Sequence, residues 1–151
     1  MQNTRSAVSM RARAATVVLA GLMMVACGPG AQADATGGLS GSYKGSITYM
    51  PQGGVTPYDD TGATMVIQPA ADGKGPTAVV TYSYQLGRCR ETCSITPHAD
   101  GTITLQGVSW KLISGDSFYP DTFTVRVAAD GSVTGTSVDS SGGTSKLSMH
   151  H

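Results

Sequence analysis

Four aspartates in two predicted loops carry the side chains best suited to chemistry in this sequence. They are Asp59, Asp60, Asp116 and Asp121. If the two loops meet, these carboxylates could hold a cation or act as an acid and base pair, as in a weak hydrolase. Aspartates in loops more often form solvated turns. We therefore predict no catalytic residue and keep hydrolysis as an alternative function.

Histidine and cysteine chemistry is limited by the small number of suitable side chains. A Ser-His-Asp hydrolase needs a positioned histidine, and the sequence offers His98 beside a predicted turn and the terminal pair His150 and His151. A metal site at Cys89 and Cys93 would need another soft ligand, for which His98 is the only candidate nearby. We expect no metal and no cofactor.

The N-terminal residues have the order of a secretory signal peptide, which we place at 1–26. Arg5, Arg11 and Arg13 precede an apolar run over 14–26, and no acidic residue occurs among them. The run is about thirteen residues long, short of the roughly 20 that a transmembrane helix needs. The chain is therefore expected to be exported.

Two cleavage sites compete at the end of this segment. Met24-Val25-Ala26-Cys27 resembles a bacterial lipobox, with methionine where leucine is usual. The resemblance implies a lipid on Cys27 and a protein anchored at the cell envelope. The alternative is cleavage after Ala33, which would leave a soluble periplasmic or secreted protein.

Charge restricts the partners of the exported chain. The signal peptide holds three of the ten basic residues and none of the ten acidic ones, so its removal leaves a net charge of about −3. This balance excludes a nucleic-acid partner and offers no polybasic surface to anionic lipid. We expect a monomer that contacts the membrane only through a lipid on Cys27.

The two remaining cysteines predict a disulfide. Cys89 and Cys93 flank Arg90-Glu91-Thr92 at the expected junction of two strands. A three-residue hairpin loop would place the two sulfur atoms opposite each other. An even pair of cysteines in an exported protein favours that bond.

The rest of the chain divides into a linker and one domain. Residues 27–38 are Gly, Ala, Pro and polar residues without periodicity, which predicts a flexible tether. Residues 39–151 predict a single domain, in which apolar and polar side chains alternate with a period of two, as they do from Tyr43 to Tyr49. Such alternation is typical of half-buried strands.

Turn signals divide this domain into strands. Asp-Gly occurs three times between runs rich in Thr, Val, Ile or Tyr, and predicts three hairpins. The predicted strands are 41–50, 62–69, 76–87, 93–98, 102–113, 121–128, 132–139 and 143–149. Short connections leave no room for a crossover helix. We predict an all-β fold, an eight-stranded antiparallel up-and-down meander closed into a β-barrel, with an open β-sandwich as second choice.

Two strands change their inward phase at a glycine. In 102–112 the apolar side chains occupy odd positions before Gly107 and even positions after it. In 132–139, Val133 and Val138 likewise fall on opposite faces of the strand on either side of Gly135. One inserted residue at a bulge would restore the inward face, so a bulge is expected at each glycine.

In an up-and-down barrel, successive connections alternate between the two ends, so the irregular loops of this domain should all lie at the same end. These loops are 50–61, 88–92, 113–121 and 140–143. Binding residues concentrate on loops that a rigid scaffold carries. The ligand-binding residues predicted on the rim are Tyr58, Asp59, Asp60, Asp116, Phe118 and Tyr119. Those predicted inside the barrel are Tyr43, Tyr49, Tyr82, Tyr84, Trp110 and Phe123.

The opening of the domain resembles a known superfamily. A secreted eight-stranded meander that begins with Gly41-Ser42-Tyr43 beside a long first loop looks like the calycins. Their lipocalin and avidin members carry Gly-x-Trp at this place and bind small hydrophobic ligands in the barrel, so Tyr43 is a departure. The resemblance covers about 110 residues in architecture and three in motif. It implies the fold more than the ligand.

These patterns predict an envelope-anchored or periplasmic binding module. Its partner would be a small apolar molecule or a protein, held at the loop end of the barrel. Small periplasmic lysozyme-inhibitor lipoproteins are similar in size, anchor and β content, so inhibition of a secreted or envelope enzyme such as lysozyme is the alternative.

Overall fold

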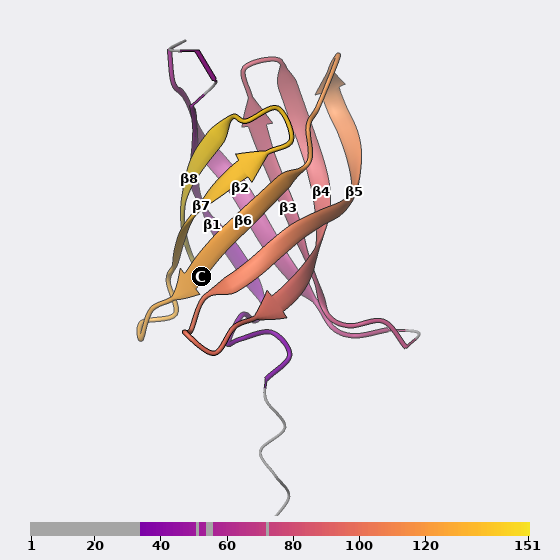
Figure 1. The fold of residues 1–151 in the computed structure, drawn as a ribbon, viewed down its shortest axis with the longest axis vertical. Helices are drawn as coiled ribbons and strands as arrows, with labels where there is room; N and C mark the ends of the chain where they lie inside the picture. The colour runs from indigo at the N-terminus through magenta and orange to yellow at the C-terminus, as the bar shows by residue number, and fades with distance from the viewer. Residues whose placement is uncertain (1–33, 51, 54–55, 72) are drawn as a thin grey trace, which may run out of the picture. The chain divides into compact units, whose positions relative to one another are not determined.

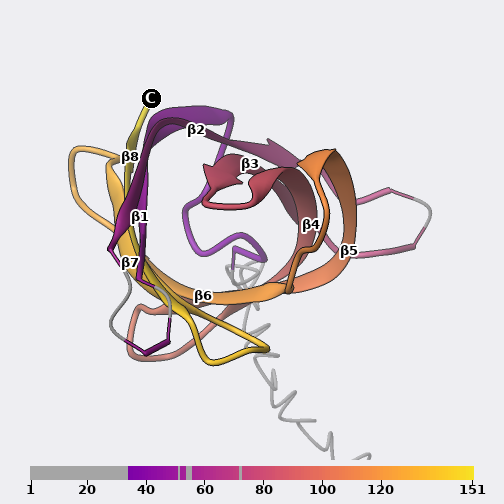
Figure 2. The same ribbon diagram turned by 90° about the horizontal axis from the view of Figure 1, so that it is seen from above.

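The computed structural model describes residues 34–50, 52–53, 56–71 and 73–151, and these form an all-β domain (Figure 1). The strands are β1 (Ser42–Met50), β2 (Tyr58–Gln68), β3 (Thr77–Tyr84), β4 (Gly87–Pro97), β5 (Ile103–Gly115), β6 (Asp121–Val127), β7 (Val133–Asp139) and β8 (Thr144–His150). They form a closed barrel in sequence order, with antiparallel neighbours and β1 paired to β8 (Figure 2). The predicted eight-stranded up-and-down barrel is confirmed. Among the described residues, no helix has the length and apolar character needed to cross a membrane.

Alternate side chains of every strand point into the barrel, as the pleat requires. The buried apolar residues are Tyr43, Ile47, Ala63, Met65, Ala78, Val80, Tyr82, Cys89, Cys93, Ile103, Leu105, Phe123, Val125, Val133, Leu147 and Met149 from the strands, together with Leu39 before them. The predicted period-two alternation reports the inward face correctly at these positions, but not in the second half of β5, where Val108 and Trp110 are exposed.

The two ends of the barrel differ, and we name them the closed end and the mouth. The closed end carries the connections from β2 to β3, from β4 to β5 (98–102) and from β6 to β7 (128–132), each of which has one Asp-Gly pair in its sequence. The mouth carries the connections from β1 to β2, from β3 to β4 (85–86), from β5 to β6 (116–120) and from β7 to β8 (140–143) (lower and upper ends in Figure 1). In the loop 98–102 the Asp100 carboxylate accepts hydrogen bonds from Thr102, and Gly101 has a φ of 79°. These contacts are the reason that Asp-Gly marks such turns.

The segment before β1 folds across the closed end. Leu39 is buried against the core, and a side chain on Gly37 would lie 2.8 Å from Ile103. Asp34 accepts hydrogen bonds from the backbone N–H groups of Thr36 and Gly38. Residues 34–38, the end of the flexible tether predicted over 27–38, thus form a turn that packs against the barrel. Residues 27–33, the signal peptide, the Ala33 cleavage site and Cys27 lie outside the described residues.

One of the two predicted bulges is present. The register between β4 and β5 shifts between Thr92 and Cys93, because Val108 is inserted next to Gly107. The bulge predicted at Gly135 is wrong, because β7 pairs with both neighbours without a shift. Val138 is exposed on the outer face, and the inward positions near it are polar.

The cysteines are also placed differently from the prediction. The turn between β3 and β4 lies at 85–86, so Cys89 and Cys93 belong to the same strand and both point inward. Residues four apart along a strand are separated by about 13 Å, whereas a disulfide needs Cα atoms within about 7 Å. Both cysteines are free thiols. The predicted hairpin-loop disulfide is therefore wrong for this structure.

Burial should make these thiols unreactive. It raises the pKa of Cys89 to about 12 and raises that of Cys93 as well, so almost no thiolate forms at pH 8. We expect iodoacetamide to modify neither cysteine in the native full-length protein. Both should be labelled after unfolding in urea without any reductant, as peptide masses would show. A peptide carrying a Cys89–Cys93 bond would contradict this expectation.

Candidate functional site

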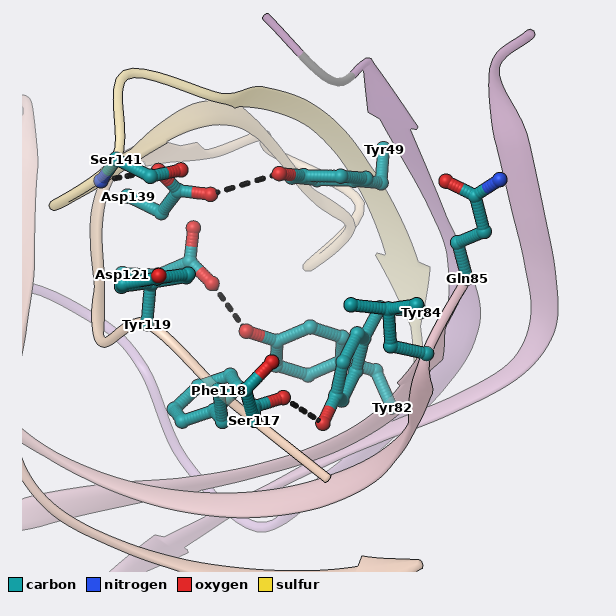
Figure 3. A pocket seen from close by; sticks show the side chains of 11 residues that line it. Tyr49, Tyr82, Tyr84, Gln85, Ser117, Phe118, Tyr119, Asp121, Asp139 and Ser141 are labelled. Carbon is teal, nitrogen blue, oxygen red and sulfur yellow. Dashed lines mark hydrogen bonds between the residues drawn. The ribbon is translucent and has the colours of Figure 1, made fainter. Parts of the chain in front are cut away.

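A cavity of about 170 Å³ opens in the mouth of the barrel (Figure 3). Five aromatic side chains and Leu86 form its apolar lining, the aromatics being Tyr49, Tyr82, Tyr84, Phe118 and Tyr119. The polar lining consists of Gln85, Ser117, Asp121, Asp139 and Ser141. Cavities of roughly 150 Å³ in other proteins hold a benzene-sized molecule. The cavity is therefore large enough for a small aromatic ligand.

Two carboxylates face this cavity from the same side, and we call Asp121 and Asp139 the carboxylate pair (Figure 3). Asp121 begins β6 and Asp139 ends β7, and they stand directly opposite each other in the antiparallel ladder. Like charges in such cross-strand positions repel each other. Tyr49 and Tyr82 reach toward the pair from the other side of the cavity.

Asp139 is held as a carboxylate by a full set of donors. The backbone N–H groups of Ser141 and Gly143 donate to Oδ1 at 2.7 and 2.9 Å, and the Ser141 hydroxyl donates at 2.6 Å. The Tyr49 hydroxyl donates to Oδ2 at 2.9 Å. Burial alone would raise the pKa of Asp139, but these donors outweigh it and the pKa is lowered. Asp139 is therefore charged at neutral pH.

Asp121 lies deeper and is less easily ionised. Its Oδ1 accepts a hydrogen bond from the Ser137 hydroxyl at 2.6 Å, and its Oδ2 accepts one from the Tyr82 hydroxyl. Burial nevertheless raises its pKa, and the charge of Asp139 raises it further. The same burial raises the pKa of the Tyr82 hydroxyl, which remains a donor.

The only glutamate of the sequence, Glu91, lies beside Asp121 and is fully buried, at 0% exposure. Its Oε1 accepts the backbone N–H of Asp121 at 3.0 Å, while Oε2 has no hydrogen-bond partner among the described residues. Gly107 makes room for it, because a side chain there would overlap the carboxyl group of Glu91. Burial raises the pKa of Glu91 to about 8, and the charge of Asp121 adds to the effect.

No basic side chain balances these acids in the part of the chain that the structure describes. The cavity lining contains no Lys, Arg or His. The ion pair that the described residues form, Arg126 with Asp100 at 3.7 Å, lies at the closed end. Buried carboxylates without a cation are costly, and such groups cluster at functional sites.

Five of the twelve predicted ligand-binding residues line the cavity. They are Tyr49, Tyr82, Tyr84, Phe118 and Tyr119. Tyr82 packs edge-to-face on Phe123 deeper in the core, with ring centroids 6.3 Å apart. Tyr43 lies at the closed end, 4.2 Å from the His151 ring. Side chains thus fill the predicted aromatic interior between Tyr82 and the closed end, and the cavity lies between Tyr82 and the mouth.

Other predicted residues lie away from the cavity. Trp110 is 51% exposed, because β5 extends past the start of β6, and it contacts Phe118 of the cavity lining with ring centroids 6.2 Å apart. Tyr58, Asp59 and Asp60 belong to β2 and not to a loop. Asp60 is buried and accepts hydrogen bonds from the backbone N–H groups of Gly62 and Ser83. Ser83 lies beyond the last β2–β3 pair, so Asp60 supplies the acceptor that the ladder does not provide there. Asp116 is exposed on the rim.

The sequence interpretation missed Asp139 and Glu91. The bulge expected at Gly135 would have turned Asp139 outward, and the loop expected at 88–92 would have exposed Glu91. A strict period of two from Val133 would have placed Asp139 inside. No local signal identifies Glu91, whose inward position depends on the turn at 85–86.

The described residues give no grouping for metal or histidine chemistry. Across the described ranges, no three His, Cys, Asp or Glu side chains are placed to hold a metal ion. His98 lies at the closed end, where its Nε2 is 2.8 Å from the Thr104 hydroxyl. It is therefore not beside the carboxylate pair.

No protein-family model, curated protein or solved structure matches this chain.

Proposed function

We propose that this protein is a binding module that holds a small molecule with an aromatic or apolar body in the mouth of the barrel. The observation that carries the proposal is the cavity of about 170 Å³ with aromatic side chains around it. Ligand sites are typically concave and mostly apolar, with a few placed polar groups. Here the walls are aromatic and the polar groups are gathered on one side.

The construction of the mouth supports a preformed site. The Tyr84 hydroxyl donates to the Ser117 carbonyl, and Phe118 packs against both Tyr82 and Tyr84, with ring centroids 6.2 and 5.8 Å away. These contacts fix the 116–120 loop over the rim. A ligand entering an already ordered pocket loses less free energy to side-chain ordering.

We expect 2-phenylethanol, a neutral aromatic probe, to bind the full-length protein. Ser117→Phe should fill the cavity and weaken binding at least about tenfold, since a core-sized side chain would occupy the ligand volume. Ser114→Phe makes the same change at an exposed position on β5 that does not line the cavity, and serves as control. Saturation-transfer NMR and calorimetric titration would measure both. Equal binding by the two variants would contradict the site.

A protein partner on the same rim is the second candidate function. Past Gln106, β5 pairs only with β4, and it exposes Val108, Trp110 and Ile113 there. An unpaired strand edge can accept an extended segment of another protein through main-chain hydrogen bonds. The outer face beside it carries Arg90 and Lys111, which favours an acidic segment. Ser117→Phe separates the two candidates, because it leaves this edge free.

Anchoring at the envelope through Cys27 belongs to the same proposal. The support for it is the lipobox-like sequence that ends at Cys27 and the packing of the segment before β1 at the closed end, where Gly37 lies beside Pro97 and Ile103. A lipid on Cys27 would hold the closed end toward the membrane and leave the mouth accessible to a diffusing ligand.

A further inference from the structure

We infer that the mouth of the barrel binds an organic cation, a protonated amine on a small aromatic or apolar body. This inference rests on the proposed function and specifies its ligand class. It follows from the acidic groups and aromatic rings around one cavity, and from the unsatisfied polar atoms buried behind the carboxylate pair.

The first argument is the uncompensated negative charge. Asp121 and Asp139 are directly opposite in the β6–β7 ladder and both line the cavity. Among the described lining residues there is no basic side chain. The two carboxylates repel each other across the ladder, and a positive group placed between them and the open cavity would relieve that repulsion.

The second argument is the aromatic surround. The rings of Tyr49, Tyr82 and Tyr84 line the cavity from the side opposite the carboxylate pair, and the hydroxyls of Tyr49 and Tyr82 point toward that pair (Figure 3). A cation near aromatic faces is attracted by their electron density, and more strongly when it is shielded from water. Carboxylates on one side and rings on the other therefore favour a positive charge joined to an apolar body.

The third argument is that buried polar atoms next to the pair lack partners. Ser145 points inward between Tyr49 and Ser137, its cross-strand neighbours, and its hydroxyl has no partner among the described residues. Glu91 adds a second unpartnered oxygen beside Asp121. Both side chains are more than nine-tenths buried. Neither side chain lines the cavity, so these atoms do not contact a ligand there, but they leave the surroundings of the pair rich in unpaired acceptors.

Other ligand classes fit the lining less well. An anion would be repelled by Asp139, and a neutral apolar molecule would remove water from that charge without replacing it. A metal ion would need a cluster of ligands, and no group of three suitable side chains exists within the described ranges. An organic cation satisfies the charge and the aromatic walls together.

The test compares three probes that share a phenyl ring and two methylene groups, on the full-length protein at pH 7. They are 2-phenylethylamine, 2-phenylethanol and 3-phenylpropionate, each titrated by calorimetry and followed by protein NMR. We expect the amine to bind at least about tenfold more tightly than the alcohol, and the carboxylate to bind more weakly than both. This comparison needs only the wild-type protein.

Two variants then locate the preference. Asp139→Asn should reduce the amine's advantage over the alcohol to within about threefold, and Asp121→Asn should reduce it as well. Asp139 also holds the 140–143 turn through hydrogen bonds. If Asp139→Asn fails to fold for that reason, the Asp121 variant and the wild-type comparison still test the inference. Asp59→Asn, at an exposed carboxylate of β2 outside the cavity, should leave the preference unchanged.

The possible failures can be told apart. If the alcohol binds as tightly as the amine, the site exists and its preference for a cation is wrong. A tenfold preference that survives in both folded carboxylate variants would also overturn the inference. If none of the three probes binds, the proposed small-molecule function fails and this inference fails with it.

Discussion

Replacing Gly45 by alanine is expected to destabilise the barrel by about 3 kcal/mol or more. Gly45 lies in β1 at the seam that closes the barrel, opposite Met149 of β8. A Cβ atom there would lie 2.7 Å from the Met149 Cα, with the Ser148 carbonyl oxygen closer still. Both obstacles are backbone, which cannot rotate away as a side chain can. The β1–β8 pairing would have to move apart.

Thermal and urea unfolding, followed by circular dichroism, would measure this effect. A loss of about 3 kcal/mol should lower the midpoint of thermal unfolding by roughly 10 °C or more in a domain of this size. Gly75→Ala is the matched control, because a Cβ at Gly75 meets nothing within 4 Å. It should change stability by no more than about 0.5 kcal/mol. Equal midpoints for the two variants would show that the seam tolerates a side chain.

The stability of the protein is expected to fall as the pH rises from about 5 to 8, and Glu91 should be the main cause. Burial raises the pKa of Glu91 from its ordinary 4.5 to about 8. Between these values the folded state keeps the proton and the unfolded state has lost it. The unfolded state therefore binds fewer protons, and the free energy of unfolding decreases with rising pH. The raised pKa of Asp121 acts in the same direction.

Glu91→Gln should remove most of this dependence. The amide is a neutral isostere of the protonated acid, and its oxygen can still accept the Asp121 N–H. At 1.36 kcal/mol per pKa unit, the raised pKa corresponds to roughly 4 to 5 kcal/mol. We therefore expect the variant to match the wild type near pH 4.5 and to exceed it by about 3 kcal/mol or more at pH 8.

Urea unfolding at several pH values would check this expectation. Asp116→Asn is the control, because Asp116 is exposed on the rim. It should keep the wild-type pH dependence. The same pH slope in wild type and Glu91→Gln would contradict the assignment to Glu91, as would a wild-type stability that increases from pH 5 to 8.

Local sequence patterns were sufficient to predict the architecture. Asp-Gly turns and a period of two along runs such as Phe123 to Val127 report short-range constraints, which are backbone conformation at a turn and burial on one face of a strand. With short connections, antiparallel neighbours and closure follow. The same patterns predicted Tyr82, Tyr84 and Phe118 correctly as inner or rim aromatics.

The same patterns failed where the inner face is polar. At the mouth, Ser137 and Asp139 occupy inward positions while Val138 is exposed, so hydrophobicity indicated the wrong phase for β7. Cys89 and Cys93 were misplaced for a related reason, because the polar residues between them resembled a loop. In both segments the inward side chains are set by register with neighbouring strands.

The sequence by itself thus determined an eight-stranded meander and the end at which its loops gather. Only the tertiary structure decided which side chains meet there, namely Asp139 opposite Asp121, and Glu91 beneath Gly107. The physical reason is that turn conformation and one-sided burial are encoded in neighbouring residues. The meeting of three acids from β4, β6 and β7 depends on cross-strand register, which no short stretch of the chain contains.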